Sequence, residues 1–73
     1  MLNLDKLKLN SIGIVLSVNC SIPIKHRLLD LGLIPGTKIT PLFISPFGDP
    51  TAYEFRGNII AIRKEEASKI IIN

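Results

Sequence analysis

Few side chains in this 73-residue chain could carry out chemistry, and they do not form a recognisable catalytic set. Cys20 and His26 are its only thiol and its only imidazole. Structural zinc or iron sites usually need three or four protein ligands, and Asp30 could at most supply a third. We therefore interpret His26 as a solvated helix-face residue. No base or orienting acid stands at a recognisable spacing from Cys20, which is predicted to be a small half-buried residue rather than a nucleophile. The sequence thus predicts no enzyme, no metal site and no cofactor.

Two arginines are better suited to binding an acidic partner. Arg27 and Arg63 each offer a fork of donors that fits a carboxylate. Each also has a structural alternative that the sequence leaves open. The stem of Arg27 could cover one mouth of the domain while its head pairs with Asp30 or Glu66 or caps backbone carbonyls. Arg63 could pair with Asp49.

Apolar residues in turns are the other candidate contacts. Phe47 lies between Pro46 and Gly48 in a tight loop, where a large side chain has little core to enter, and exposed apolar loop tips often mark contacts. The alternative is that Phe47 folds back over the end of the domain. Leu33 and Ile34 form an apolar corner after a helix. The residues predicted to contact a partner are Arg27, Leu33, Ile34, Phe47 and Arg63.

The whole-chain properties limit the class of protein. A hydrophobic content of 47% with 21% charged residues is typical of a folded chain. Residues 1–73 are expected to form one domain with residues 1–11 as an N-terminal arm, in which Leu4 and Leu7 pack onto the rest. The net charge of +3 is mild and scattered, so it does not require a nucleic-acid partner. A single cysteine fits a reducing compartment, and neither a signal peptide nor a membrane span is evident. We expect a cytoplasmic protein that does not insert into a membrane.

One short helix and its glycine stop organise the chain. Ser21 is a plausible N-cap, and the apolar stripe Ile24, Leu28 and Leu31 predicts a helix over residues 23–31. Gly32 can adopt the left-handed conformation that ends a helix. The pair 35–36, Pro-Gly, then suits the centre of a type II turn.

Five short strands are predicted around this helix. Residues 12–18 alternate, and they place Ile12, Ile14, Leu16 and Val18 on one face. In the second strand Pro41 indicates an edge or a bulge, and Gly57-Asn58 is predicted to be a two-residue hairpin turn. The remaining strands are expected at 37–45, 51–56, 59–63 and 70–72, with one helical turn at 64–68. Short strands with a tight hairpin favour a closed, mainly β barrel, because closure hides strand edges. The order fits an SH3-like five-stranded barrel with the helix between strands one and two, and an OB-type barrel is the second choice.

Four stretches in register resemble one family. The segment 27–36, RLLDLGLIPG, is similar to the RLxxLGLxPG signature of the FeoA-like domains of ferrous iron transport protein A. The segment 45–50, SPFGDP, resembles the family's (A/S)PLGDP loop with Phe47 in place of leucine. Residues 61–63 resemble its ALR strand, and 70–72 its closing apolar strand. The resemblance covers roughly residues 12–73, and the glycine that often precedes the first strand is missing at about Leu9 or Asn10.

The resemblance implies an SH3-like barrel and a cytosolic accessory to the FeoB ferrous-iron permease, acting through the cytoplasmic side that carries a G-protein domain. The chain has no room for the helix-turn-helix of metal-dependent repressors that share the module. Two other functions stay open on the residues alone. One is a nucleic-acid-binding barrel, although most of the four aromatic residues should lie in the core. The other is a self-associating module, in which the strand at 70–72 or the Pro41 strand pairs between copies.

Overall fold

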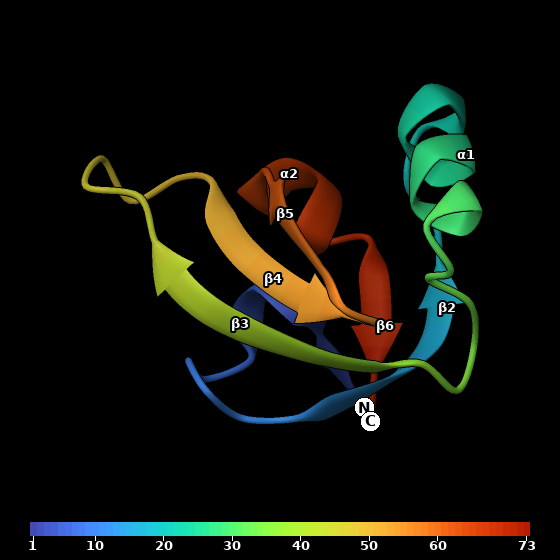
Figure 1. Cartoon of the computed structure of the whole chain (residues 1–73), viewed down its shortest axis with the longest axis horizontal. Helices are drawn as coiled ribbons and strands as arrows, with labels where there is room; N and C mark the ends of the chain where they lie inside the picture. The colour runs from blue at the N-terminus through green and yellow to red at the C-terminus, as the bar shows by residue number, and fades with distance from the viewer.

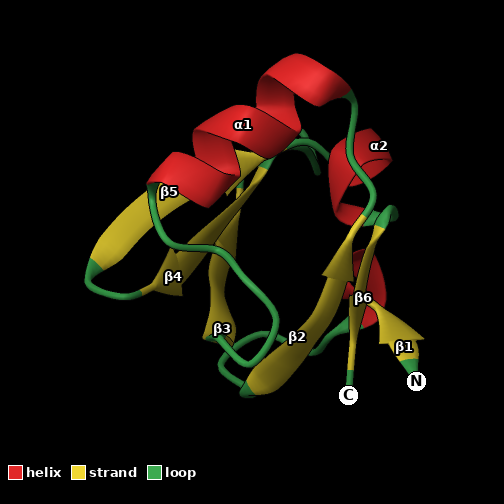
Figure 2. Ribbon diagram, turned by 90° about the vertical axis from the view of Figure 1, so that its right-hand side faces the viewer, coloured by secondary structure: helices red, strands yellow, loops and turns green.

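The computed structural model describes all 73 residues as one antiparallel sheet curled around a small core. In chain order the elements are β1 (Leu2–Asn3), the 3-10 turn η1 (Leu4–Lys6), β2 (Gly13–Val18), α1 (Ile22–Asp30), β3 (Lys38–Ile44), β4 (Thr51–Phe55), β5 (Asn58–Ile62), α2 (Lys64–Ala67) and β6 (Ile70–Ile72). The strand order is β1-β6-β2-β3-β4-β5. The sheet bends so that β3, β4 and β5 face β2 and β6, and α1 lies across the open side between the two halves (Figures 1 and 2).

The core fills the space inside this curl. Its most completely buried large side chains are Phe55, Leu4, Leu28, Leu33, Ile39, Ile70, Ile72 and Val15. They come from every part of the chain, so no element has an independent core. The helix α1 contributes Leu28, with Ile24 and Leu31 partly buried beside it, as its apolar stripe predicted.

The end of α1 is a Schellman motif followed by a tight turn. Gly32 has φ of +96°, the amide of Gly32 donates to Leu29 O at 2.9 Å, and the amide of Leu33 donates to Leu28 O at 2.9 Å. Thr37 N then donates to Ile34 O at 3.0 Å across the Pro-Gly pair, as in a type II turn. The glycine stop and the turn predicted from the sequence are therefore confirmed.

The N-terminal arm is part of the sheet, which makes the strand count six rather than the five expected. Leu2 pairs with Ile72, and Leu4 is fully buried. Leu7 also packs against the core, as predicted. Asn10 has φ of +65°, a region that asparagine tolerates better than most residues, so the turn before β2 forms without a glycine.

In β2 the buried face is opposite to the one on which the predicted apolar residues alternate. Val15 is fully buried, whereas Ile12 is 65% and Leu16 39% exposed. A register shift between Val15 and Ser17 lets Val18 pack against the core farther along. In β3 a register shift follows Pro41, so the predicted irregularity is a bulge and not an edge.

The hairpin between β4 and β5 turns one residue earlier than predicted. Phe55 pairs with Asn58, so the turn residues are Arg56 and Gly57, with φ of 48° and 79°. Positive φ at both positions defines a type I′ turn. The predicted pair Gly57-Asn58 was wrong because Arg56, a residue without turn preference, occupies the left-handed region.

The strand edges also differ from those expected. The terminal strand β6 lies between β1 and β2, and the Pro41 strand β3 lies between β2 and β4. Neither can therefore present a free edge to another copy, and the edge strands are β1 and β5.

Candidate partner-binding surface

The residues that could bind metal do not come together. No group of three or more His, Cys, Asp or Glu side chains is placed to hold an ion. His26 is exposed on α1. Cys20 is buried, with its Sγ 3.4 Å from Glu66 O. Burial, reinforced by the nearby negative charge of Glu66, raises the pKa of the Cys20 thiol to about 11. A neutral, buried thiol is a poor nucleophile and a poor metal ligand. Cys20 was predicted to be half-buried, and at 7% exposure it lies deeper than that.

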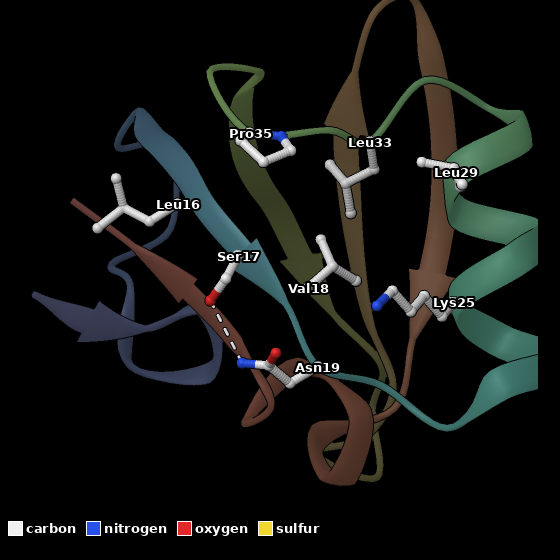
Figure 3. Close-up of a pocket in the computed structure, with 8 residues that line it drawn as sticks. All are labelled: Leu16, Ser17, Val18, Asn19, Lys25, Leu29, Leu33 and Pro35. Carbon is white, nitrogen blue, oxygen red and sulfur yellow. Dashed lines mark hydrogen bonds between the residues drawn. The ribbon is translucent and has the colours of Figure 1, made fainter.

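A groove with a volume of about 250 Å³ separates β2 from α1 (Figure 3). Its apolar lining residues are Leu16, Val18, Leu29, Leu33 and Pro35, and its polar ones are Ser17, Asn19 and Lys25. The close-up shows Val18, Leu29 and Leu33 around the space between strand and helix, with the Lys25 side chain reaching toward them. The groove could hold an apolar side chain of a partner next to a positive charge.

Leu33 is a core residue rather than the exposed corner predicted. Its side chain is 1% exposed, and it forms only part of the floor of the groove. The Schellman motif turns Leu33 inward against Leu28, because both belong to the apolar contact that accompanies this helix end. Ile34, at 39% exposure, is the residue of this corner that a partner could contact.

A second groove, of about 130 Å³, lies between α1 and β5 and brings the two predicted arginines together. Its lining residues are Ile24, Arg27, Leu28, Ile60, Ala61, Ile62, Arg63 and Glu66. Arg27 is exposed and forms no ion pair, so the alternative in which it pairs with Asp30 or Glu66 is not the one found. Arg63 does pair with Asp49, at 3.7 Å, as its structural alternative predicted.

Phe47 projects from a well-bonded loop. Its side chain is 94% exposed, so it does not fold back over the domain. Gly48 N donates to Ser45 O at 2.8 Å, and Ser45 N donates to Pro50 O at 3.0 Å. At the base of the loop Lys64 N donates to Asp49 Oδ1 at 2.8 Å. These bonds hold a large apolar side chain in water, which is the arrangement expected of a contact residue.

The predicted contacts do not form one continuous surface. The loop that carries Phe47 and the corner at Ile34 lie at opposite ends of β3 (Figure 1). Arg63 lies near the Phe47 loop, because it pairs with Asp49 in that loop. It also lines the second groove together with Arg27. A partner that contacts all of these residues would have to span the α1 and β5 side of the molecule.

Sequence reasoning missed the residue that anchors α1. Glu66, only 7% exposed, accepts from Ser21 N at 3.1 Å and from Ser21 Oγ at 3.3 Å through its Oε1. Its Oε2 lies 3.5 Å from Lys69 Nζ. Ser21 thus precedes α1 as predicted, but its hydroxyl contacts α2 rather than capping its own helix. No local pattern signals a bond between residues this far apart in the chain.

The anchor makes stability depend on pH. The hydrogen bond from the Ser21 amide, aided by the Lys69 charge, lowers the pKa of Glu66 below its ordinary 4.5. A carboxyl whose pKa is lowered by folding stabilises the fold above its ordinary pKa, and this contribution is lost as the pH falls through the folded-state value. We expect Glu66→Gln to reduce the drop in urea midpoint between neutral and acidic pH. Glu65→Gln, at an exposed neighbour, is the control, and an unchanged pH profile for Glu66→Gln would contradict the assignment.

The chain is similar to solved structures of one family. The model of the FeoA domain matches residues 2–73. The FeoA protein from Chlorobium tepidum is 34% identical with a TM-score of 0.92, over 97% of this chain and 68% of that one. The zinc complex of Stenotrophomonas maltophilia FeoA, described as a prokaryotic SH3 domain protein, is 25% identical with a TM-score of 0.85, over 100% of this chain and 91% of that one.

The iron(II) transport protein A from Clostridium thermocellum is 25% identical with a TM-score of 0.86, over 97% of this chain and 44% of that one. No curated protein matches the chain. The fold is therefore the SH3-like fold of these structures.

Proposed function

The chain belongs to the FeoA domain family, which is associated with ferrous iron transport, and on that premise we propose that it is an accessory protein of iron uptake. It docks on the cytoplasmic side of a FeoB-type permease and modulates transport. The family match over residues 2–73 is the observation that carries the proposal. The related Stenotrophomonas maltophilia protein is described as a candidate ferrous iron transport activating factor.

The surface supports an adaptor. Phe47, Ile34, Arg27 and Arg63 are all exposed. Arg27 and Arg63 line the groove between α1 and β5. None of the helices has the length and hydropathy needed to cross a membrane. We propose these four residues as contacts of the permease.

The aromatic residues give less support to nucleic-acid binding. Tyr53 and Phe55 are 3% and 1% exposed, so they cannot stack on bases. Phe43 and Phe47 are exposed, but binding platforms for single strands combine such rings with a positively charged groove that follows the backbone. The scattered net charge of +3 does not provide one.

Phe47 provides the direct test. Burying a phenylalanine side chain at an interface is worth about 1.5–3 kcal/mol, which corresponds to about ten- to hundredfold in affinity. We expect Phe47→Ser to weaken binding to the purified cytoplasmic G-protein region of the permease by at least about tenfold. Calorimetric titration measures the affinity, and an uptake assay in cells measures the effect on transport.

Ile12→Ser is the matched control, because Ile12 is also an exposed apolar residue at 65% but precedes β2. It should bind as the unmodified protein does. Absence of binding at high micromolar concentration, together with normal uptake after deletion of the gene, would refute the proposal.

A further inference from the structure

The strand β5 is an edge strand with unused backbone groups. It pairs with β4 and with no other strand. In a hairpin with a two-residue turn, the residue pair beside the turn is hydrogen-bonded, and hydrogen-bonded pairs then alternate with non-hydrogen-bonded ones along the strands. The pairs Phe55–Asn58 and Tyr53–Ile60 therefore use their backbone groups in bonds between β4 and β5. Ile59 and Ala61 therefore direct their N–H and C=O groups away from β4. Both residues are exposed, and neither backbone takes part in a bond outside the ladder.

A helix runs alongside this edge and leaves a groove between them. At one end Asn58 Nδ2 donates to Leu31 O at 3.1 Å, and at the other Glu66 holds Ser21 before the start of α1. These two anchors fix α1 lengthwise beside β5, and the 130 Å³ groove lies between the helix and residues 60–62. An edge strand next to a helix, with a groove between, is the arrangement in which PDZ-type domains add an extended peptide as an extra strand.

The charges of the groove select the peptide. Arg27 lines it from α1, and Arg63 lines it at the end of β5. Glu66 is the only acidic residue in the lining, and its oxygens already contact Ser21 and Lys69. Arg27 has no carboxylate partner within the chain. Arg63 contacts only Asp49, at 3.7 Å, and its side chain is 72% exposed, so it can also reach a carboxylate of the peptide. The groove is therefore complementary to an acidic segment, and it would disfavour a basic one.

We propose that the groove between α1 and β5 binds an extended acidic peptide segment of a protein partner, which pairs with β5 as an added strand. Backbone groups of Ile59 and Ala61 bond to the segment, and Arg27 and Arg63 bind its carboxylates. The inference rests on the proposed function only for the identity of the partner, the iron permease. The chemistry of the segment follows from the groove itself.

Synthetic peptides test the site directly. The probes are capped octapeptides in which valine alternates with aspartate, with serine or with lysine. Each is titrated into the isotope-labelled protein while backbone amide shifts are followed by NMR. The aspartate peptide should move the amides of Ile59 and Ala61, its binding should weaken with added salt, and the lysine peptide should not bind.

Two variants test the contributions of backbone pairing and of the arginine charges to peptide binding separately. Ala61→Pro removes the outward N–H, and proline is tolerated on an edge strand where that group faces solvent. Ala61→Ser keeps the N–H and is its control. Ala61→Pro, and independently the double variant Arg27→Glu with Arg63→Glu, should each weaken the aspartate peptide by about tenfold. Circular dichroism verifies that each variant is folded.

The outcomes distinguish this inference from the proposed function. If no peptide moves the Ile59 and Ala61 amides at millimolar concentration, or if the shifts fall on another face, the inference is overturned. It is also overturned if the permease region binds Ala61→Pro as tightly as the unmodified protein, and the proposed function then stands. If the aspartate peptide binds at β5 but the permease region does not bind at all, the inference holds and the proposed function fails.

Discussion

Leu33→Asp is expected to leave the chain unfolded at room temperature. Leu33 is 1% exposed and packs with Leu28 in the core. Removing a buried leucine side chain costs about 2–5 kcal/mol, and burying a carboxylate without a partner adds several kcal/mol more. A domain of this size is typically stable by about 4–11 kcal/mol, at roughly 0.05–0.15 kcal/mol per residue. The expected loss is therefore comparable with the whole stability of the fold.

The adjacent residue provides the control. Ile34 follows Leu33 directly but is 39% exposed, so Ile34→Asp should retain a cooperative urea transition close to that of the unmodified protein. Far-UV circular dichroism and urea titration of both variants measure the difference. A folded Leu33→Asp with a near-normal midpoint would mean that Leu33 does not lie in the core.

Gly32→Val is expected to destabilise the fold by about 3 kcal/mol. Gly32 has φ of +96°, and a non-glycine residue held in the left-handed region costs about 1–3 kcal/mol, with β-branched residues at the upper end. A Cβ at this position would also lie 2.7 Å from Arg56 Cδ. The Arg56 side chain would have to move away from Gly32, and its contact with the end of α1 would be lost.

Gly36→Val separates these two causes. Gly36 has a similar φ of +94°, but nothing lies within 4 Å of an added Cβ. It should therefore lose less stability than Gly32→Val in urea titrations, and adding Arg56→Ala to Gly32→Val should recover part of the difference. Equal losses at the two glycines would show that the contact with Arg56 has no energetic effect.

Sequence reasoning succeeded where the signal was local. The helix, its glycine stop and the turn that follows depend on residues a few positions apart, and each residue type has a backbone reason to be there. The tight loop at 45–50 was predicted on the same grounds, whereas the exposure of Phe47 was left open. The barrel class followed from the number and spacing of the strands.

It failed where the outcome depends on distant residues. The strand β1 exists because Leu2 meets Ile72, and α1 is anchored because Ser21 meets Glu66. Neither pairing leaves a trace in local composition. The burial of Leu33 rather than Ile34 depends on the direction that the chain takes after Gly32, which the apolar character of both residues does not reveal.

The groove between α1 and β5 was missed for a similar reason. Arg27 and Arg63 were each predicted to contact a partner, but nothing in the sequence shows that they line the same groove. Their meeting depends on where α1 crosses the sheet. The free edge of β5 depends on the strand order, which was also not predicted.

The pairing of β1 with β6 brings the two ends of the chain side by side (Figure 1). A short linker could therefore close the chain into a ring, and new ends could be opened in the exposed loop around Phe47. Any polypeptide fused to either terminus would leave the domain from the same point. The domain could accordingly be carried as an insert within a larger protein, with both connections at a single place on its surface.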